Sequence, residues 1–186
     1  NAFDLLKKDG TFVIEVQYLL DTIRDLTFDN IYHEHYNYWS VLSLKNFFEN
    51  LGLQVSKVQH VDTHGGSIRV YVTEKTQNVD KSVDKFITEE LEFGLDKLET
   101  YREFEKRIQE CKEETVRKIN KMKENGDVIV GYGSPAKATT VLNYYGIDNE
   151  VIDYIIEDNE LKHDKLLPGV RIPIKGKDDV VADKVL

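Results

Sequence analysis

The order of hydrophobic and polar positions predicts alternating helices and strands in the first 75 residues. The run TFVIEVQY is mostly apolar, β-branched or aromatic, which is typical of a strand, and we expect it to be central in a sheet. The run VLSLKNFFENLG has the apolar spacing of a short amphipathic helix that ends at Gly52. The expected elements are a helix at 2–10 capped by Gly10, a strand at 11–18, a helix at 41–52, and strands at 53–61 and 67–75 joined by DTHGG.

The pattern changes from residue 78 to residue 125, where the chain is rich in charge. Apolar residues recur there every three or four positions, which indicates solvated helices with one packed seam, divided near Gly94. This tract is assigned no chemistry. Beyond it the pattern predicts a strand–helix–strand unit and a third extended piece: a strand at 127–133, a helix at 136–146 after Pro135, a strand at 150–158 and an extended piece at 166–174.

Composition narrows the class of protein. The 186 residues are enough for one large or two small domains, and a net charge of -9 argues against a nucleic-acid partner, which needs a basic face. A single cysteine excludes an intrachain disulfide. No apolar run approaches the ~20 residues of a membrane span, so we expect no membrane partner and a cytoplasmic location. The chain opens without methionine, and we expect it to be a fragment.

The segment DNIYHEHYNYW concentrates groups that carry chemistry. Residues 29–39 hold two of the five histidines and the only tryptophan of the chain. One interpretation is a zinc site, because His33 and His35 at i, i+2 would share one face of a strand. A third ligand would have to come from elsewhere, and no cysteine pair or H-E-x-x-H motif is present. A second interpretation is packing, with the imidazoles at the rim of a core.

The third interpretation is proton transfer. The carboxylate of Glu34 lies between two imidazoles in an expected loop after a strand end, where catalytic groups collect. A histidine with a pKa near ~6.5 accepts a proton at neutral pH. A tyrosine hydroxyl such as that of Tyr32 can donate to an oxygen on which negative charge develops. This set suits deprotonation of a carbon beside a carbonyl, with His35 as the candidate base.

Two glycine motifs are further candidates for binding. THGGSIR is either a turn between strands or a place where ligand and backbone approach closely, with His64 facing the same cleft as His35. Arg69 either neutralises a phosphate or forms a surface pair. GYGSPAK fits G-x-G-x-x-A at a strand end, with acidic residues 157 and 158 after the next strand. That arrangement makes NAD binding a rival to substrate binding, and a purely structural turn is the other alternative.

The motifs FDNIYHEHYNYW, HGGSIRVYV and GYGSPAKATTVLNYYGI, in this order, resemble the sugar C-methyltransferase family over residues 1–175. The resemblance implies an α/β fold in three parts: residues 1–77 as the end of a class I methyltransferase domain, 78–125 as a helical connection, and 126–186 as a truncated Rossmann-like domain. The zinc module and most contacts to S-adenosylmethionine would lie outside this chain, so no metal is assigned to it.

The resemblance also implies the chemistry. A base removes a proton beside the ketone of a nucleotide-linked deoxysugar, such as a dTDP-ketodeoxysugar, and the enolate attacks the methyl group of S-adenosylmethionine. His35 falls on the family's proposed base, with Glu34 orienting it and Tyr32 bonding the enolate oxygen. The implied substrate-binding residues are His64, Gly65, Gly66, Arg69, Gly131, Tyr132, Gly133, Ser134 and Lys137.

Overall fold

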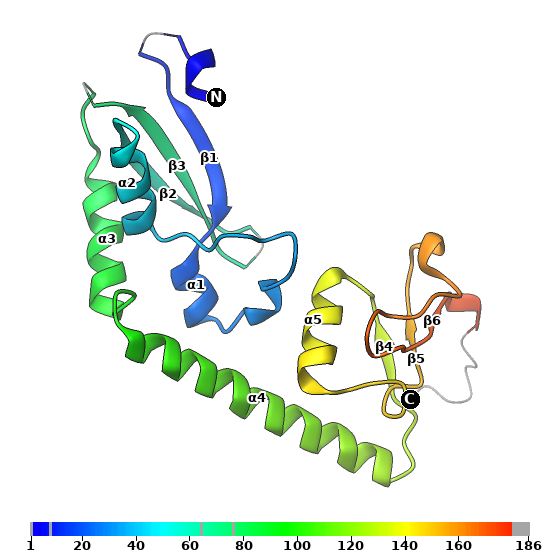
Figure 1. The fold of residues 1–186 in the computed structure, drawn as a ribbon. Coiled ribbons are helices and arrows are strands. Elements are labelled where there is room, and N and C mark those ends of the chain that lie inside the picture. Colours follow the sequence, from blue (N-terminus) through cyan, green and yellow to red (C-terminus); the bar gives the residue numbers. More distant parts are fainter. Residues whose placement is uncertain (1, 8, 64, 76, 180–186) are drawn as a thin grey trace. The chain divides into compact units, whose positions relative to one another are not determined.

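A computed structural model describes residues 2–7, 9–63, 65–75 and 77–179 of the chain (Figure 1). The described part contains five α-helices and two three-stranded sheets. The chain forms two compact units, the first made of residues 1–28 and 36–106 and the second of residues 29–35 and 107–186. No helix in the described ranges is both long and apolar enough to cross a membrane.

The first unit is built on an antiparallel sheet of order β1-β3-β2. Its elements are β1 (Phe12–Gln17), α1 (Leu19–Arg24), α2 (Val41–Asn50), β2 (Leu53–Val61), β3 (Ser67–Glu74) and α3 (Lys81–Phe93). The predicted hairpin of β2 and β3 is confirmed, with Val61 opposite Ser67. The helices α2 and α3 contact β2 and each other.

The expectation that the first strand is central is wrong for this chain. Within the described residues β1 pairs only with β3, and the central strand is β3. Side chains of β1 alternate between half-buried and exposed over most of its length, and Val13 is 46% exposed. Only one face of β1 packs on the core. The run still looks mostly apolar in the sequence, because an exposed β-branched residue such as Val13 adds to its apolar content without being buried.

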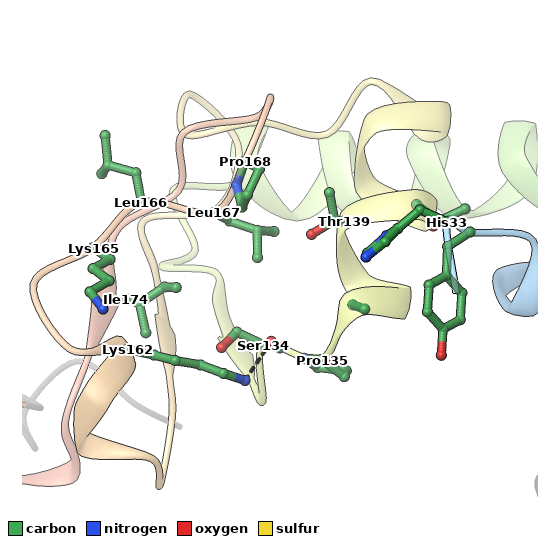
Figure 2. Close-up of a pocket in the computed structure, with 13 residues that line it drawn as sticks. His33, Ser134, Pro135, Thr139, Lys162, Lys165, Leu166, Leu167, Pro168 and Ile174 are labelled. Atoms are coloured by element: carbon green, nitrogen blue, oxygen red, sulfur yellow. Dashed lines mark hydrogen bonds between the residues drawn. The ribbon is translucent and has the colours of Figure 1, made fainter. Parts of the chain in front are cut away.

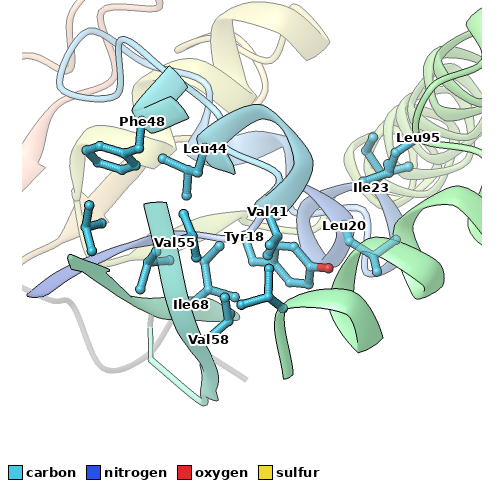
Figure 3. Close-up of a cluster of buried hydrophobic side chains, with 13 residues drawn as sticks. Tyr18, Leu20, Ile23, Val41, Leu44, Phe48, Val55, Val58, Ile68 and Leu95 are labelled. Atoms are coloured by element: carbon cyan, nitrogen blue, oxygen red, sulfur yellow. The ribbon is translucent and has the colours of Figure 1, made fainter. Parts of the chain in front are cut away.

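The core of the first unit lies between the sheet and its helices. The inward residues of β3, including Ile68 and Val70, are fully buried (Figure 3). Leu20 of α1 and Leu44 of α2 belong to the same buried cluster. Removal of this apolar surface from water is what holds α1 and α2 on the sheet.

Local signals explain where the helices begin and end. The Ser40 side chain accepts from the Ser43 N–H and so caps α2, and Gly94 ends α3 with a left-handed φ of 88°. The predicted division of the charged tract at Gly94 is confirmed, and α4 (Leu98–Glu124) follows it. At the start of the chain the predicted helix is a single 3₁₀ turn (Ala2–Leu5), and the left-handed residue is Asp9 instead of Gly10.

The second unit contains the expected strand–helix–strand arrangement. Its strands β4 (Val130–Tyr132), β5 (Tyr154–Ile156) and β6 (Ile174–Lys175) are parallel and lie in that order. The helix α5 (Ala136–Tyr145) connects β4 to β5 and ends at Gly146, which confirms the predicted helix (Figure 1). The strands are shorter than the runs that predict them. Three 3₁₀ turns complete the described elements: η2 (Phe28–Asn30), η3 (Glu160–Lys162) and η4 (Lys177–Asp179).

A glycine in the hairpin turn is required by close packing against a buried carboxylate. Gly66 has a φ of 107°, and a Cβ atom added to it would overlap the side chain of Asp21. We expect Gly66→Ala to lower the free energy of unfolding by about 3 kcal/mol, from strain and overpacking together. Gly52→Ala is the matched control, since Gly52 has a φ of 79° but a Cβ atom added to it would meet nothing within 4 Å. If urea unfolding gave the same loss of free energy of unfolding for both variants, the overlap of the new Cβ atom with Asp21 would contribute nothing to the destabilisation.

Candidate functional site

A cavity of about 500 Å³ lies in the second unit, beside the first turn of α5 (Figure 2). Pro135 and Ala136 form one part of its wall, and Leu167, Pro168 and Ile174 form another. Tyr32 and His33 also line it, and they belong to the second unit with the rest of the segment 29–35. The cavity thus brings together two of the three motifs that the sequence singles out.

The residues Tyr32, His33, Glu34 and His35 form a turn, closed by a bond from the His35 N–H to the Tyr32 carbonyl at 3.0 Å. The turn places the Tyr32 hydroxyl 3.2 Å from Nε2 of His35 and 3.4 Å from Oε2 of Glu34. Tyr32 and His35 are half-buried, whereas Glu34 and His33 are exposed. The structure therefore brings the three predicted residues into contact, with Tyr32 between the other two.

The Tyr32 hydroxyl has a single proton to donate, and both Glu34 and His35 lie within hydrogen-bonding distance of it. Partial burial and then the Glu34 carboxylate raise the pKa of Tyr32, so the group is an O–H donor at neutral pH. If this proton goes to Glu34, His35 donates its Nε2–H to the Tyr32 oxygen, and Nδ1 holds the lone pair of the neutral ring. The arrangement can take up a proton at Nδ1 and stabilise the imidazolium that forms.

The geometry differs from the one that the zinc interpretation needs. His33 and His35 lie in a turn instead of a strand, and the His33 side chain is 81% exposed. Among the residues that the structure describes, no group of three or more His, Cys, Asp or Glu side chains is arranged to hold a metal ion.

The loop before α5 owes its glycines to the fold. A Cβ atom on Gly131 would lie 2.9 Å from Ile155 of the neighbouring strand, and Gly133 has a φ of 82°. The N–H of Ser134 donates to Oε2 of Glu157 at 2.9 Å, and the hydroxyl of Ser134 donates to the same oxygen. Glu157 stands at the end of β5, so its side chain reaches back to the loop.

The other polar residues of this motif also have partners within the chain. The Tyr132 hydroxyl donates to Asp158 at 2.8 Å, and Asp158 pairs with Lys177 at 2.7 Å. Lys137 lies 3.7 Å from the carboxylate of Asp29, within the second unit. The Ser134 hydroxyl donates its proton to Glu157, so its oxygen can only accept a hydrogen bond from a ligand.

The motif THGGSIR lies at the carboxyl end of β1, where Gln17 faces Ser67. His64 is outside the described residues. Arg69 makes a two-point pair with Glu15 on the adjacent strand, at 2.8 and 3.2 Å, which is the surface pair that the sequence allowed. Gly65 and Gly66 border a shallow pocket of about 290 Å³.

That pocket is acidic. Its lining includes the carboxylates of Asp21, Asp25 and Asp62 and the imidazole of His60. The buried Asp21 accepts from Nε2 of His60 at 2.7 Å, a pair that the sequence pattern did not indicate because the two residues are 39 positions apart. The excess of negative charge disfavours a phosphate at this place.

Comparisons with known proteins identify the family of the chain. Residues 62–185 match the family described as the C-methyltransferase C-terminal domain, and the chain belongs to this family. It is 36% identical, over 172 residues, to the C-methyltransferase NovU of Streptomyces niveus. The alignment covers 91% of this chain and 41% of that relative, so the chain spans less than half of the relative's length. The resemblance that the sequence motifs indicated is confirmed.

Proposed function

We propose that the chain is the C-terminal part of an S-adenosylmethionine-dependent methyltransferase that C-methylates a nucleotide-linked ketodeoxysugar through an enolate. The observation that carries the proposal is the contact of Tyr32 with both His35 and Glu34. Tyr32 also lines the cavity beside α5, whereas Glu34 and His35 are not among the residues that line it. Membership of a C-methyltransferase family supports the reaction class.

The residues of this chain would act on the carbon acid. Nδ1 of His35 removes the proton beside the ketone, and the resulting imidazolium keeps its hydrogen bond to Tyr32 through Nε2. The Tyr32 hydroxyl turns its proton from Glu34 to the enolate oxygen, where an O–H donor stabilises the developing charge. S-adenosylmethionine, when bound, would supply the electrophilic methyl group, and the sequence resemblance implies that its main binding elements would lie outside this chain.

The proposal includes a domain assignment. Residues 1–77 would be the closing part of a class I methyltransferase domain, since β1 and the hairpin of β2 and β3 form one sheet, as a fifth strand and a closing strand pair require. Residues 78–125 would be the helical connection and residues 126–186 a Rossmann-like domain, which the parallel order β4-β5-β6 supports.

The rival interpretation, an NAD-binding module, is not favoured. In a dinucleotide site the loop N–H groups face the pyrophosphate and the acidic residue after the next strand bonds the ribose. Here the acidic residue Glu157 bonds the loop itself, and Asp158 is paired with Lys177.

Calorimetric titration of the chain tests this choice of ligand. We expect saturable heat with a dTDP-ketodeoxysugar and none with NAD, since the cavity wall is mostly apolar and the loop donors are occupied. A titration with S-adenosylmethionine serves as the specificity control. Saturable heat with NAD and none with the sugar nucleotide would reverse the order of the two interpretations.

A further inference from the structure

The loop between β4 and α5 is bonded to a carboxylate, that of Glu157, which follows β5. Oε2 of Glu157 accepts from the N–H and hydroxyl of Ser134, and Oε1 accepts from the Asn159 N–H at 3.1 Å. The side chain of Glu157 is 13% exposed. Bonds from Ser134, then from the Asn159 N–H, hold the pKa of Glu157 down at about 2, so the carboxylate is charged at any physiological pH.

A lysine balances this charge. The ammonium of Lys162 donates to Oε2 of Glu157 at 3.1 Å. It also donates to the Ser134 carbonyl at 2.9 Å (Figure 2). It also lines the cavity. An ammonium has three N–H donors, so one remains beyond these two bonds. The side chain thus carries a donor at the cavity wall, but most of its charge is offset by the carboxylate next to it.

Other N–H groups of the loop are used as well. The Gly133 N–H donates to the Ile156 carbonyl at 2.7 Å, and the Ser134 N–H faces Glu157. A phosphate brought to this loop would meet a carboxylate in the position where a bound phosphate accepts its hydrogen bonds. Repulsion between two anions in contact opposes binding, and the ammonium of Lys162, which bonds to this loop, is already paired with Glu157. Lys165, the other lysine of the cavity wall, donates to the Leu161 carbonyl.

We propose that Glu157 and Lys162 are specificity-determining residues: their ion pair fills the phosphate position of the loop and excludes diphosphates and dinucleotides from it. The adjoining cavity then takes an uncharged, oxygen-bearing group with apolar faces, to which the remaining N–H of Lys162 donates. If the proposed function holds, that group is the deoxysugar, and the diphosphate lies away from this loop.

Titration with inorganic pyrophosphate tests the exclusion. The wild-type chain should give no saturable heat, whereas Glu157→Gln should bind pyrophosphate at least about tenfold more tightly, because removing the carboxylate charge leaves Lys162 uncompensated. Lys162→Met added to Glu157→Gln should return the affinity to the wild-type level. The matched control is Glu150→Gln, which changes the net charge equally at an exposed residue that precedes β5 instead of following it.

The outcomes separate clearly. Saturable binding of pyrophosphate to the wild-type chain would overturn the proposal without any variant, so a folding defect in Glu157→Gln cannot protect it. Equal affinities in Glu157→Gln and Glu150→Gln would also overturn it. Since no sugar or methyl donor is used, a failure here leaves the methyltransferase proposal in place, and a failure of methyl transfer leaves this result in place.

Discussion

Replacing His35 by alanine in the proposed full-length methyltransferase is expected to lower the rate of methyl transfer by about 10²- to 10⁴-fold, the usual contribution of a positioned base. The reason is that the variant lacks the imidazole that can take a proton at Nδ1 while it is bonded to the Tyr32 hydroxyl. Stability should change little, since His35 is half-buried and its described side-chain bond is to one hydroxyl. The measurement is turnover of a dTDP-ketodeoxysugar with S-adenosylmethionine labelled in its methyl group.

His33→Ala is the comparison variant. His33 lies two residues away on the same turn and lines the cavity, whereas the bond to the Tyr32 hydroxyl is made by His35. The His33 side chain is 81% exposed and lies 4.0 Å from Glu34, so we expect a change in rate of only a few-fold. Circular dichroism checks that both variants fold. Undiminished turnover in folded His35→Ala would remove the residue from the role of base, and a loss confined to His33→Ala would transfer the role to that histidine.

Replacing Glu90 by alanine is expected to destabilise the first unit by about 3 kcal/mol, because two buried N–H groups lose their acceptor. Glu90 of α3 is only 1% exposed and accepts from the N–H groups of Val41, at 2.5 Å, and Leu42, at 3.0 Å, at the start of α2. The Glu90 carboxylate thus accepts from the first N–H groups of α2 and links α2 to α3. Urea unfolding measures the loss.

Glu89→Ala is the control for the position in the helix. The Glu89 side chain is 45% exposed and pairs with Arg24 at 2.9 Å, so its loss should cost less than about 1 kcal/mol. Equal losses for the two variants would show that the bonds from α2 contribute nothing.

The Glu90 carboxylate should also give the stability a dependence on pH. Burial raises the pKa of Glu90 above its ordinary value of 4.5, and burial, together with the charge of Glu90, raises the pKa of Tyr18. Between pH 4.5 and the raised pKa the folded chain keeps a proton that the unfolded chain has released. The contribution of Glu90 to the free energy of unfolding therefore falls as the pH rises through this window, and Glu90→Ala should lack that fall.

Much of the fold follows from local pattern. The helix that ends near Gly52, the helix that ends at Gly94 and the helix that ends at Gly146 were predictable, because each has apolar periodicity and a left-handed glycine at its end. Helix α1 was not predicted. It follows β1 with no turn residue between them, and its Asp21 and Thr22 are buried, which breaks the apolar pattern typical of a helix.

The candidate site was predictable in its residues but less so in its contacts. The cluster of Tyr32, Glu34 and His35 is visible in the sequence, yet whether it forms a strand or a turn depends on bonds that no pattern shows. Glu157 was visible as the acid of a dinucleotide fingerprint. Its side chain turns back to Ser134 instead, and the direction of a side chain after a strand depends on packing that the sequence does not reveal.

The pairing of β1 with β3 has a cost in conformational entropy, because the paired residues are far apart in the sequence. The hairpin of β2 and β3 closes a loop of five residues, 62–66, whereas joining Gln17 to Ser67 closes one of 49 residues, 18–66. The roughly tenfold longer loop costs about 2 kcal/mol more to close. Side chains must offset that difference, and Phe12, Ile14 and Val16 are the ones that pack on the core. The apolar side chains of the strand that precedes the His35 segment thus help to offset the entropy lost when this strand joins the sheet.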